Sequence, residues 1–166
     1  MQHPHAVIRE GESEAGFTLI ELMMVVLIIA ILIAVMIPTF VGAKQRAQDR
    51  AMQSSLHNAL TAAKVVYSDH GDYTQASTTG LATAEPALSF VVANTSSPGP
   101  NVISVNPVST SYIVMAGQSR SGNCFFLSDD ESAAGAGVLY AKTPNAGTCN
   151  ANAAPAAGNP SWATTW

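Results

Sequence analysis

A long run of apolar residues dominates the N-terminal third of the chain. Residues 22–43 contain no charged side chain, and their apolar positions lie on every side of a helix rather than along one stripe. At a rise of about 1.5 Å per residue, a helix of this length extends about 33 Å, which matches the hydrocarbon core of a bilayer. The pattern therefore predicts a helix that contacts lipid or packs closely among like helices.

After this run the pattern becomes that of an amphipathic helix. Apolar side chains recur at steps of three and four, at Met52, Leu56, Ala59, Leu60, Ala63, Val66 and Tyr67. Pro38 lies near the end of the apolar run, where it removes one backbone donor and is expected to kink or locally open the helix. We expect the helix to continue past Pro38 and to end before Gly71, with a length of about 50 residues.

Short strand-like runs occupy the second half of the chain. Turn-forming clusters separate four of them, at residues 102–106, 111–117, 124–128 and 137–142. Their spacing predicts an antiparallel meander that packs against the amphipathic part of the helix. Together these elements predict an α+β fold, in which a long N-terminal helix packs on a C-terminal antiparallel β-sheet.

The segments around these strands have weaker patterns. Residues 71–110 are rich in Ser, Thr, Asn and Pro, and we expect a connecting loop there with a short helix near Thr83–Val92. Residues 143–166 have an excess of Ala, Asn, Gly and Pro without periodicity, which predicts an irregular surface segment. Trp162 and Trp166 are expected to pack against the sheet, because open tails seldom keep two indoles.

Composition and charge exclude some classes of function. The 166 residues provide room for one domain and a membrane segment, and only 11% of them are charged. The formal net charge is −4, and the sequence has no clustered basic face that would predict a nucleic-acid groove. The strongest basic cluster comprises Lys44, Arg46 and Arg50, with Asp49 among them. A helix end that is solvated, or that lies at the level of lipid headgroups, explains this cluster.

The two cysteines, Cys124 and Cys149, lie late in the chain and have no partners at metal-like spacing. In a translocated domain an even count predicts one disulfide, whereas in a reducing compartment the two thiols would stay unpaired. A bridge would close a loop of about 25 residues and would stabilise the fold by roughly 3–4 kcal/mol on the loop-entropy estimate.

The apolar run has three interpretations. A secretory signal peptide would end near Val41-Gly42-Ala43, where the residues are small, but its apolar core would be shorter and its leader basic. The leader here is acidic, with Arg9 against three glutamates. A plain signal anchor is the second interpretation, with Glu21 as an incidental interfacial charge.

The third interpretation depends on the residues that precede the run. Gly16 is followed by an aromatic residue, Phe17, then by Thr18, and Glu21 lies four positions after Phe17. Together with a hydrophobic helix that has a proline in its last third, residues 16–39 closely resemble the N-terminal segment of the type IV pilin and pseudopilin family. The resemblance implies that a prepilin peptidase cuts between Gly16 and Phe17 and then methylates the new amine of Phe17.

The resemblance also gives Glu21 a role. Cleavage leaves an ammonium group at Phe17 in the apolar setting of a filament core. A carboxylate about one helical turn away, on the same or a neighbouring subunit, would neutralise it, because a buried unpaired charge is costly. We therefore expect Glu21 to act in assembly, together with Thr18 and with Pro38, which would let the helix adjust locally.

The family likeness implies a domain organisation and a location. Residues 1–16 would be a cleaved leader, residues 17–43 the transmembrane and filament-core half of the helix, and residues 44–166 a globular pilin domain. That domain would contain the amphipathic half of the helix (44–70), the connecting loop (71–110), and the sheet with a disulfide-bounded C-terminal region (111–166).

We expect a single-pass membrane protein before assembly and an extracellular or cell-surface filament afterwards. The distribution of Lys and Arg around the apolar run would by itself place the globular part in the cytoplasm. Long domains, however, translocate with little regard to such counts, and the cysteine pair fits an oxidising exterior.

No residues form a pattern for catalysis, so we do not expect an enzyme. The four histidines lack metal-site spacing. The adjacent acids Asp129, Asp130 and Glu131, in a predicted loop, are a weak candidate for binding calcium, as in the major pseudopilins, and an acidic solvated turn is the simpler explanation. No other cofactor is expected.

The leading hypothesis is a structural subunit of a type IV pilus-like filament. Its partners would be further copies of itself, minor pilins, the prepilin peptidase, and the platform protein and ATPase of an assembly machine in the membrane. One alternative is a pseudopilin of a type II secretion system. Another is a secreted binding module that signal peptidase releases with Lys44 as its first residue.

Overall fold

The computed structural model of the chain describes residues 16–133, 137–159 and 161–166. Its residues form two compact units, of which the first ends at Val41 and the second comprises Gly42–Trp166. Helix α1 (Leu19–His70) contributes residues to both units. The units are described separately.

The first unit is the N-terminal part of α1. The helix passes through Pro38 without interruption, and the Thr39 hydroxyl donates a hydrogen bond of 2.8 Å to the carbonyl oxygen of Met36. The large apolar side chains of this part are all exposed, from 44% at Ile33 to 78% at Leu19. Continuation of the helix past Pro38 is confirmed, whereas the kink at Pro38 stays a prediction.

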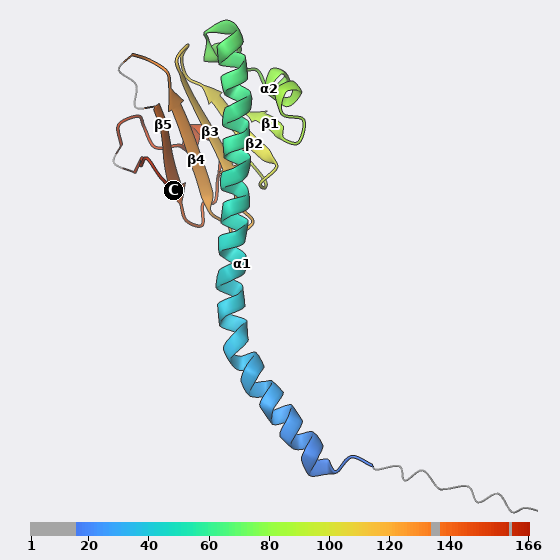
Figure 1. Cartoon of the computed structure of the whole chain (residues 1–166). Coiled ribbons are helices and arrows are strands. Elements are labelled where there is room, and N and C mark those ends of the chain that lie inside the picture. The colour runs from blue at the N-terminus through green and yellow to red at the C-terminus, as the bar shows by residue number, and fades with distance from the viewer. Residues whose placement is uncertain (1–15, 134–136, 160) are drawn as a thin grey trace, which may run out of the picture. The chain divides into compact units, whose positions relative to one another are not determined.

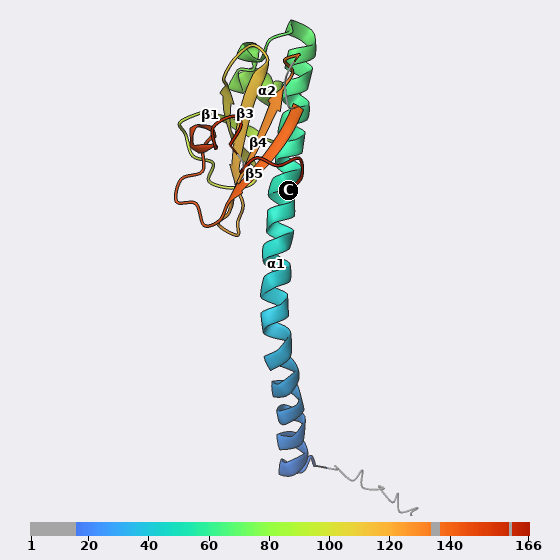
Figure 2. The same cartoon turned by 90° about the vertical axis from the view of Figure 1, so that its left-hand side faces the viewer.

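The second unit is a five-stranded sheet with the C-terminal part of α1 on one face (Figures 1 and 2). The strands are β1 (Ser89–Val92), β2 (Val102–Pro107), β3 (Tyr112–Gln118), β4 (Cys124–Asp130) and β5 (Gly137–Thr143). They lie in the order β1-β2-β3-β4-β5, with β1 parallel to β2 and the other neighbours antiparallel. The predicted α+β fold and the four-stranded meander are confirmed, and α1 ends at His70 as expected.

The segment expected to be a connecting loop is more ordered than the sequence indicated. The prediction of a helix near Thr83–Val92 is wrong. Helix α2 (Thr78–Ala84) ends at the second residue of this range, and β1 occupies the end of the range. Ser77 caps α2 by accepting from the amide of Gly80 at 3.1 Å. The helix then stops because Pro86 disfavours the α conformation at the residue before it. A short 3₁₀ turn, η1 (Tyr73–Gln75), precedes α2.

The main hydrophobic core lies between α1 and the sheet. The predicted stripe of α1 is buried there, with Met52, Leu56, Ala59 and Ala63 completely covered. It packs against side chains that alternate along the strands, namely Ile103, Val105, Ile113, Met115, Phe125 and Leu127. The period of 3.6 on the helix and of two on the strands therefore produces one continuous apolar layer.

A second, smaller core covers the opposite face of the sheet. The strand residues between those of the main core, Val114, Ala116, Cys124 and Phe126, pack there against the C-terminal segment. This segment contains the 3₁₀ turn η2 (Ala151–Ala153) and an isolated bridge from Ala163 to Tyr140. The described part of this segment is mostly irregular and exposed, as expected, and its few buried residues also cover this face of the sheet.

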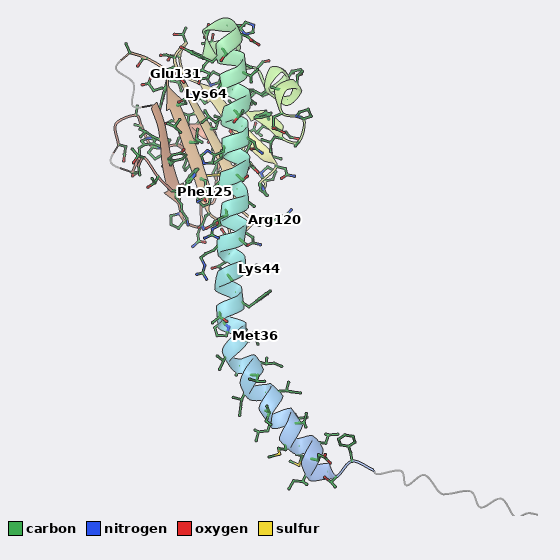
Figure 3. The ribbon with its side chains drawn as sticks, viewed as in Figure 1. Met36, Lys44, Lys64, Arg120, Phe125 and Glu131 are labelled. Carbon is green, nitrogen blue, oxygen red and sulfur yellow. A yellow bond between two sulfur atoms is a disulfide. The ribbon has the colours of Figure 1, made fainter. Side chains whose placement is uncertain are left out.

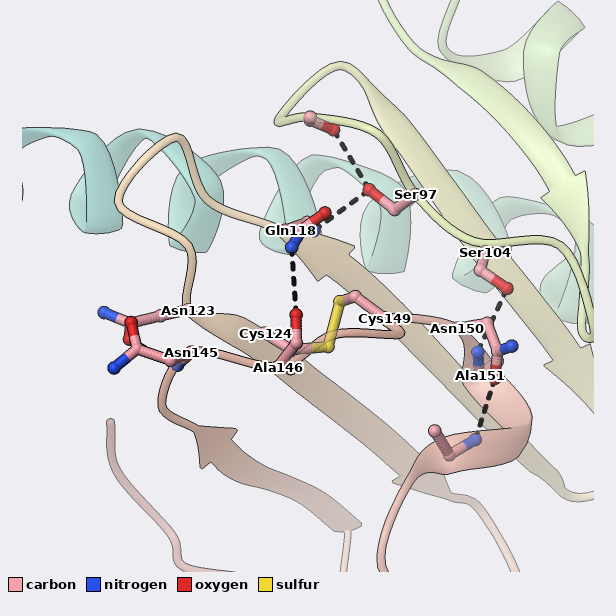
Figure 4. The surroundings of a disulfide bond; sticks show 12 residues. Ser97, Ser104, Gln118, Asn123, Cys124, Asn145, Ala146, Cys149, Asn150 and Ala151 are labelled. Atoms are coloured by element: carbon pink, nitrogen blue, oxygen red, sulfur yellow. Dashed lines mark hydrogen bonds between the residues drawn. A yellow bond between two sulfur atoms is a disulfide. The ribbon is translucent and has the colours of Figure 1, made fainter.

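The Cys124–Cys149 disulfide fastens this segment to β4 (Figure 4). Around it, the Gln118 side chain donates to the carbonyl of Ala146 at 3.2 Å, and the amide of Ala151 donates to the Ser104 hydroxyl at 3.0 Å. The bridge predicted from the cysteine count is confirmed.

Both tryptophans pack as expected from the sequence. Trp166 contacts Phe125 and Tyr140 of the sheet, with ring centroids 5.2 and 4.7 Å away. Trp162 packs against the second core and donates from its indole nitrogen to the carbonyl of Pro155 at 3.1 Å.

Helix α1 lies close against the sheet at Gly117 on β3. A β-carbon at Gly117 would lie 2.7 Å from the sulfur of Met52, a distance that real side chains essentially never show. Met52 is itself completely buried, so its side chain has little freedom to move aside. Glycine at this position lets the helix lie close to the strand.

Replacing this glycine tests the helix–sheet contact. We expect Gly117→Ala to lower the free energy of unfolding by about 1–3 kcal/mol, because the added methyl group overpacks a closed core. The measurement is denaturant unfolding of the purified chain in detergent, followed by near-UV circular dichroism. Gly99→Ala is the control, since nothing lies within 4 Å of a β-carbon there. Equal effects of the two variants would contradict the close contact.

Candidate functional site

The segment that sequence analysis singled out lies at the start of α1. Gly16, Phe17 and Thr18 precede the helix and are exposed, and Phe17 is 79% accessible. Nothing lies within 4 Å of a β-carbon built on Gly16. The Gly16–Phe17 peptide bond is therefore in open, non-helical chain, which is the form of substrate that a protease can approach.

Thr18 is the N-cap of α1. Its hydroxyl accepts from the amide of Glu21 at 3.2 Å, and its carbonyl oxygen accepts from the amide of Leu22 at 3.2 Å. Thr-x-x-Glu is the capping-box pattern, in which a side chain satisfies an amide that the first turn leaves without a partner. From the sequence, Thr18 was expected to act in assembly with Glu21, and that role stays a prediction. Its role as a cap was not predicted, although the Thr-x-x-Glu spacing was a readable signal for it.

Glu21 lies in the first turn of α1. A carboxylate at this position interacts favourably with the positive end of the helix dipole. It is also the only charged side chain between Phe17 and Ala43 in the sequence. Its position one turn after Phe17 is the arrangement that pairing with a new amine requires, and the pairing itself stays a prediction.

The helix that follows is long enough and apolar enough to cross a membrane, and its most apolar window is entirely exposed. Figure 3 shows side chains of this part of α1, Met36 among them, pointing away from the helix axis. Because contiguous apolar surface of this extent is unfavourable in water, lipid or other protein must cover it.

Comparison with known families identifies this segment. Residues 13–37 match the model of the prokaryotic N-terminal methylation motif. The chain carries a prepilin-type signal. No curated protein and no solved structure matches the chain. The prepilin-type signal supports a subunit of the type IV pilin or pseudopilin type, and it implies processing by prepilin peptidase.

Outside the prepilin-type signal, two polar clusters join α1 to the sheet. The first is centred on Asp49, whose carboxylate accepts from Asn123 Nδ2 at 3.0 Å, from Lys142 Nζ at 3.2 Å and from the Ser121 hydroxyl. In the sequence, Asp49 only interrupts a basic cluster, and no sequence signal indicated its partners on the β3–β4 turn and on β5.

Burial alone would raise the pKa of the Asp49 carboxyl, but its hydrogen bonds outweigh this effect and lower the pKa below 3.8. The donors are Ser121, Ser119, Lys142 and Asn123.

The second cluster contains part of the acidic run that was a weak calcium candidate. The run was expected in a loop, but Asp129 and Asp130 are the last residues of β4, and only Glu131 follows the strand. Asp129 is 1% exposed and forms an ion pair of 3.0 Å with Lys64 of α1, which also pairs with Glu131 (Figure 3). The hydroxyl of Tyr73 donates to the same Asp129 oxygen.

These contacts do not favour a calcium site. Successive strand residues point to opposite faces, so the carboxylates of Asp129 and Asp130 do not converge. Within residues 16–133, 137–159 and 161–166, no group of three His, Cys, Asp or Glu side chains is placed to hold a metal ion. Calcium binding stays a prediction from the sequence.

Burial, hydrogen bonds and neighbouring charges also shift two pKa values in this cluster. Burial alone would lower the pKa of the Lys64 ammonium, but hydrogen bonds and charges from Glu131 and Asp129 raise it above the usual value. Burial and the hydrogen bond to Asp129 raise the pKa of the Tyr73 phenol, which therefore stays a neutral donor. A buried carboxylate with a cation and a phenol as partners is a structural anchor of the helix.

The Asp49 cluster predicts an acid-dependent stability. Because the pKa of Asp49 is lowered by folding, its stabilisation is complete above the unfolded value near 3.8 and is lost as pH falls through the folded value. We expect Asp49→Asn to lower the free energy of unfolding by roughly 1–3 kcal/mol at pH 7 and by less in acid. Thermal unfolding of both chains across this pH range measures the difference.

Asp69→Asn, an exposed change on the same helix, is the control and should have little effect at any pH. A deficit of Asp49→Asn that stays constant into acid would contradict the role of the ionised carboxylate.

Proposed function

We propose that this chain is the structural subunit of a type IV pilus-like filament, assembled through the apolar part of α1. One observation carries the proposal: a prepilin-type signal at residues 13–37 covers the start of a long helix, and this part of the helix is apolar on all sides and exposed. A membrane covers such a surface before assembly, and neighbouring copies of the same helix cover it afterwards.

The proposed life cycle starts with a single-pass membrane precursor. Prepilin peptidase removes the leader at Gly16 and methylates Phe17, and a platform protein and an ATPase then move the subunit into a fibre with minor pilins. The globular unit lies outside the cytoplasm in this proposal. The Cys124–Cys149 disulfide supports that side, because such bridges persist in oxidising compartments.

A pseudopilin of a type II secretion system is the closest alternative, since it would carry the same signal. The family resemblance implies that a disulfide-bounded C-terminal region is more typical of surface pili than of pseudopilins. Cys149 closes such a region here. The absence of converging carboxylates at Asp129–Glu131 in the described chain weakens the calcium-binding likeness to the major pseudopilins. A pilus is therefore the function we favour.

Intact mass of the exported protein tests the processing step. We expect a chain that begins at methylated Phe17, and we expect Gly16→Val to retain the leader, because a side chain at this position hinders approach to the backbone. Ala43→Leu is the matched control: it removes the small residue of the alternative signal-peptidase site and should leave processing unchanged. A product that begins at Lys44 and is lost in Ala43→Leu would show instead a released, non-filament protein.

Loss of the Glu21 carboxylate tests the assembly step. We expect Glu21→Gln to remain stable and membrane-inserted but to reduce surface filaments at least about tenfold, because the amine of Phe17 then has no counter-charge in the filament core. Filaments are counted by electron microscopy, and subunit levels in membranes are measured in parallel.

Asp69→Asn removes a carboxylate from the other half of α1 and should leave the filament count unchanged. Normal filaments in Glu21→Gln would refute the pairing. If the wild type makes no long extracellular filament but its deletion stops protein secretion, the chain is a pseudopilin.

A further inference from the structure

A hollow of about 270 Å³ lies in the second unit beside the start of its helical part, at the end of the sheet where β4 begins and β5 ends. Four of its residues come from one face of α1 and three from the sheet and the C-terminal segment: Arg46, Asp49, Arg50, Gln53, Phe125, Lys142 and Trp166. Residues three and four apart are neighbours on a helix surface, so the two arginines lie side by side at this hollow.

The charges of the hollow favour an anion. The salt bridges among the described residues involve Lys64 and Lys142, and none involves Arg46 or Arg50. Three cations line the hollow against Asp49, and they still outnumber the anions by three to two if a terminal carboxylate at Trp166 is counted. The two guanidinium groups at this hollow are thus without a carboxylate partner among the described residues.

Asp49 does not neutralise these arginines, because its carboxylate is already engaged. It accepts from Lys142 and from two residues of the β3–β4 turn, Ser121 and Asn123. Opposite the arginines the wall is aromatic, with the ammonium of Lys142 lying 5.1 Å from the centre of the Phe125 ring and Trp166 packed against the same ring. The hollow therefore combines a cationic side with an apolar side.

The sequence places the Arg46 edge of this hollow at the depth of lipid headgroups. The uncharged run ends at Ala43, so along the helix Arg46 lies about 4.5 Å and Arg50 about 10 Å beyond it. The headgroup layer on each side of a bilayer is about 5–8 Å thick. When the apolar run spans a membrane, the backbone of Arg46 therefore lies within the headgroup layer. The backbone of Arg50 lies just outside it, at a distance that its long side chain can span toward the phosphates.

We propose that this hollow binds the phosphate of an anionic phospholipid while the subunit is stored in the membrane. Arg46 and Arg50 hold the phosphate oxygens through paired N–H donors, a geometry that guanidinium groups provide and ammonium groups do not. Phe125 and Trp166 form the wall of the hollow that is farther from the apolar run, where Trp166 reaches His57, and they contact the headgroup from that side. The proposal rests on the membrane-stored precursor of the proposed function, and not on the filament.

Native mass spectrometry of the full chain in detergent tests this site. The chain is titrated with phosphatidylglycerol and, separately, with zwitterionic phosphatidylcholine, and the bound lipids are counted. We expect the wild type to retain phosphatidylglycerol in preference to phosphatidylcholine, and Arg46→Gln/Arg50→Gln to lose at least about tenfold in affinity for phosphatidylglycerol. Thermal unfolding of each variant confirms that it is folded.

Lys44→Gln/Arg120→Gln is the charge-matched control, because neither residue lines the hollow. It should change the affinity by less than about twofold, since an unspecific attraction depends on net charge and not on the site. An equal loss in both double variants, no loss in either, or no preference of the wild type for the anionic lipid would overturn the proposal.

A third titration, with inorganic phosphate, separates a lipid site from a site for the free ion. We expect no displacement of phosphatidylglycerol at equal concentrations, and displacement there would overturn the assignment to lipid. Processing at Gly16 and filament formation are measured independently, so failure of lipid binding leaves the proposed function standing.

Discussion

The apolar surface at the N-terminal end of α1 must be covered, and this requirement is the main constraint on the environment of the protein. About two dozen residues present aliphatic side chains on all sides, and none of the large ones is buried. A globular domain would cover such a surface with its own chain, and here that cover must come from lipid or from other copies. A single acid at its start, Glu21, is then the one charged side chain that must find a partner in the same surroundings.

The globular unit is organised by the other half of the same helix. Its apolar stripe lies between two polar anchors, Asp49 near one end and Lys64 nearer the other. These anchors are separated by about 22 Å along the helix. A slide of one turn would separate both from their partners on the sheet and would bury Asp129 without a counter-charge, which is costly. The stripe supplies the attraction, and the anchors set the register.

Much of the fold could be predicted because it depends on periodicity. The helix, its end at His70 and the four strands of the meander follow from patterns that repeat over several residues. Strand β1 was missed because it is short and pairs in parallel with β2, a contact set by tertiary packing. The partners of Asp49 and Asp129 could not be predicted either, since they lie 56 to 93 residues away in the chain.

The disulfide determines when the C-terminal segment becomes attached to the sheet. It attaches the C-terminal segment to the face of the sheet that α1 does not cover. Because cytosolic thiols are kept reduced, this disulfide would form, in the proposed life cycle, only after the globular unit has been exported. The helix-covered face needs no such event. In that proposal the second covering layer of the sheet is completed last, on the far side of the bilayer, and only an exported subunit carries it.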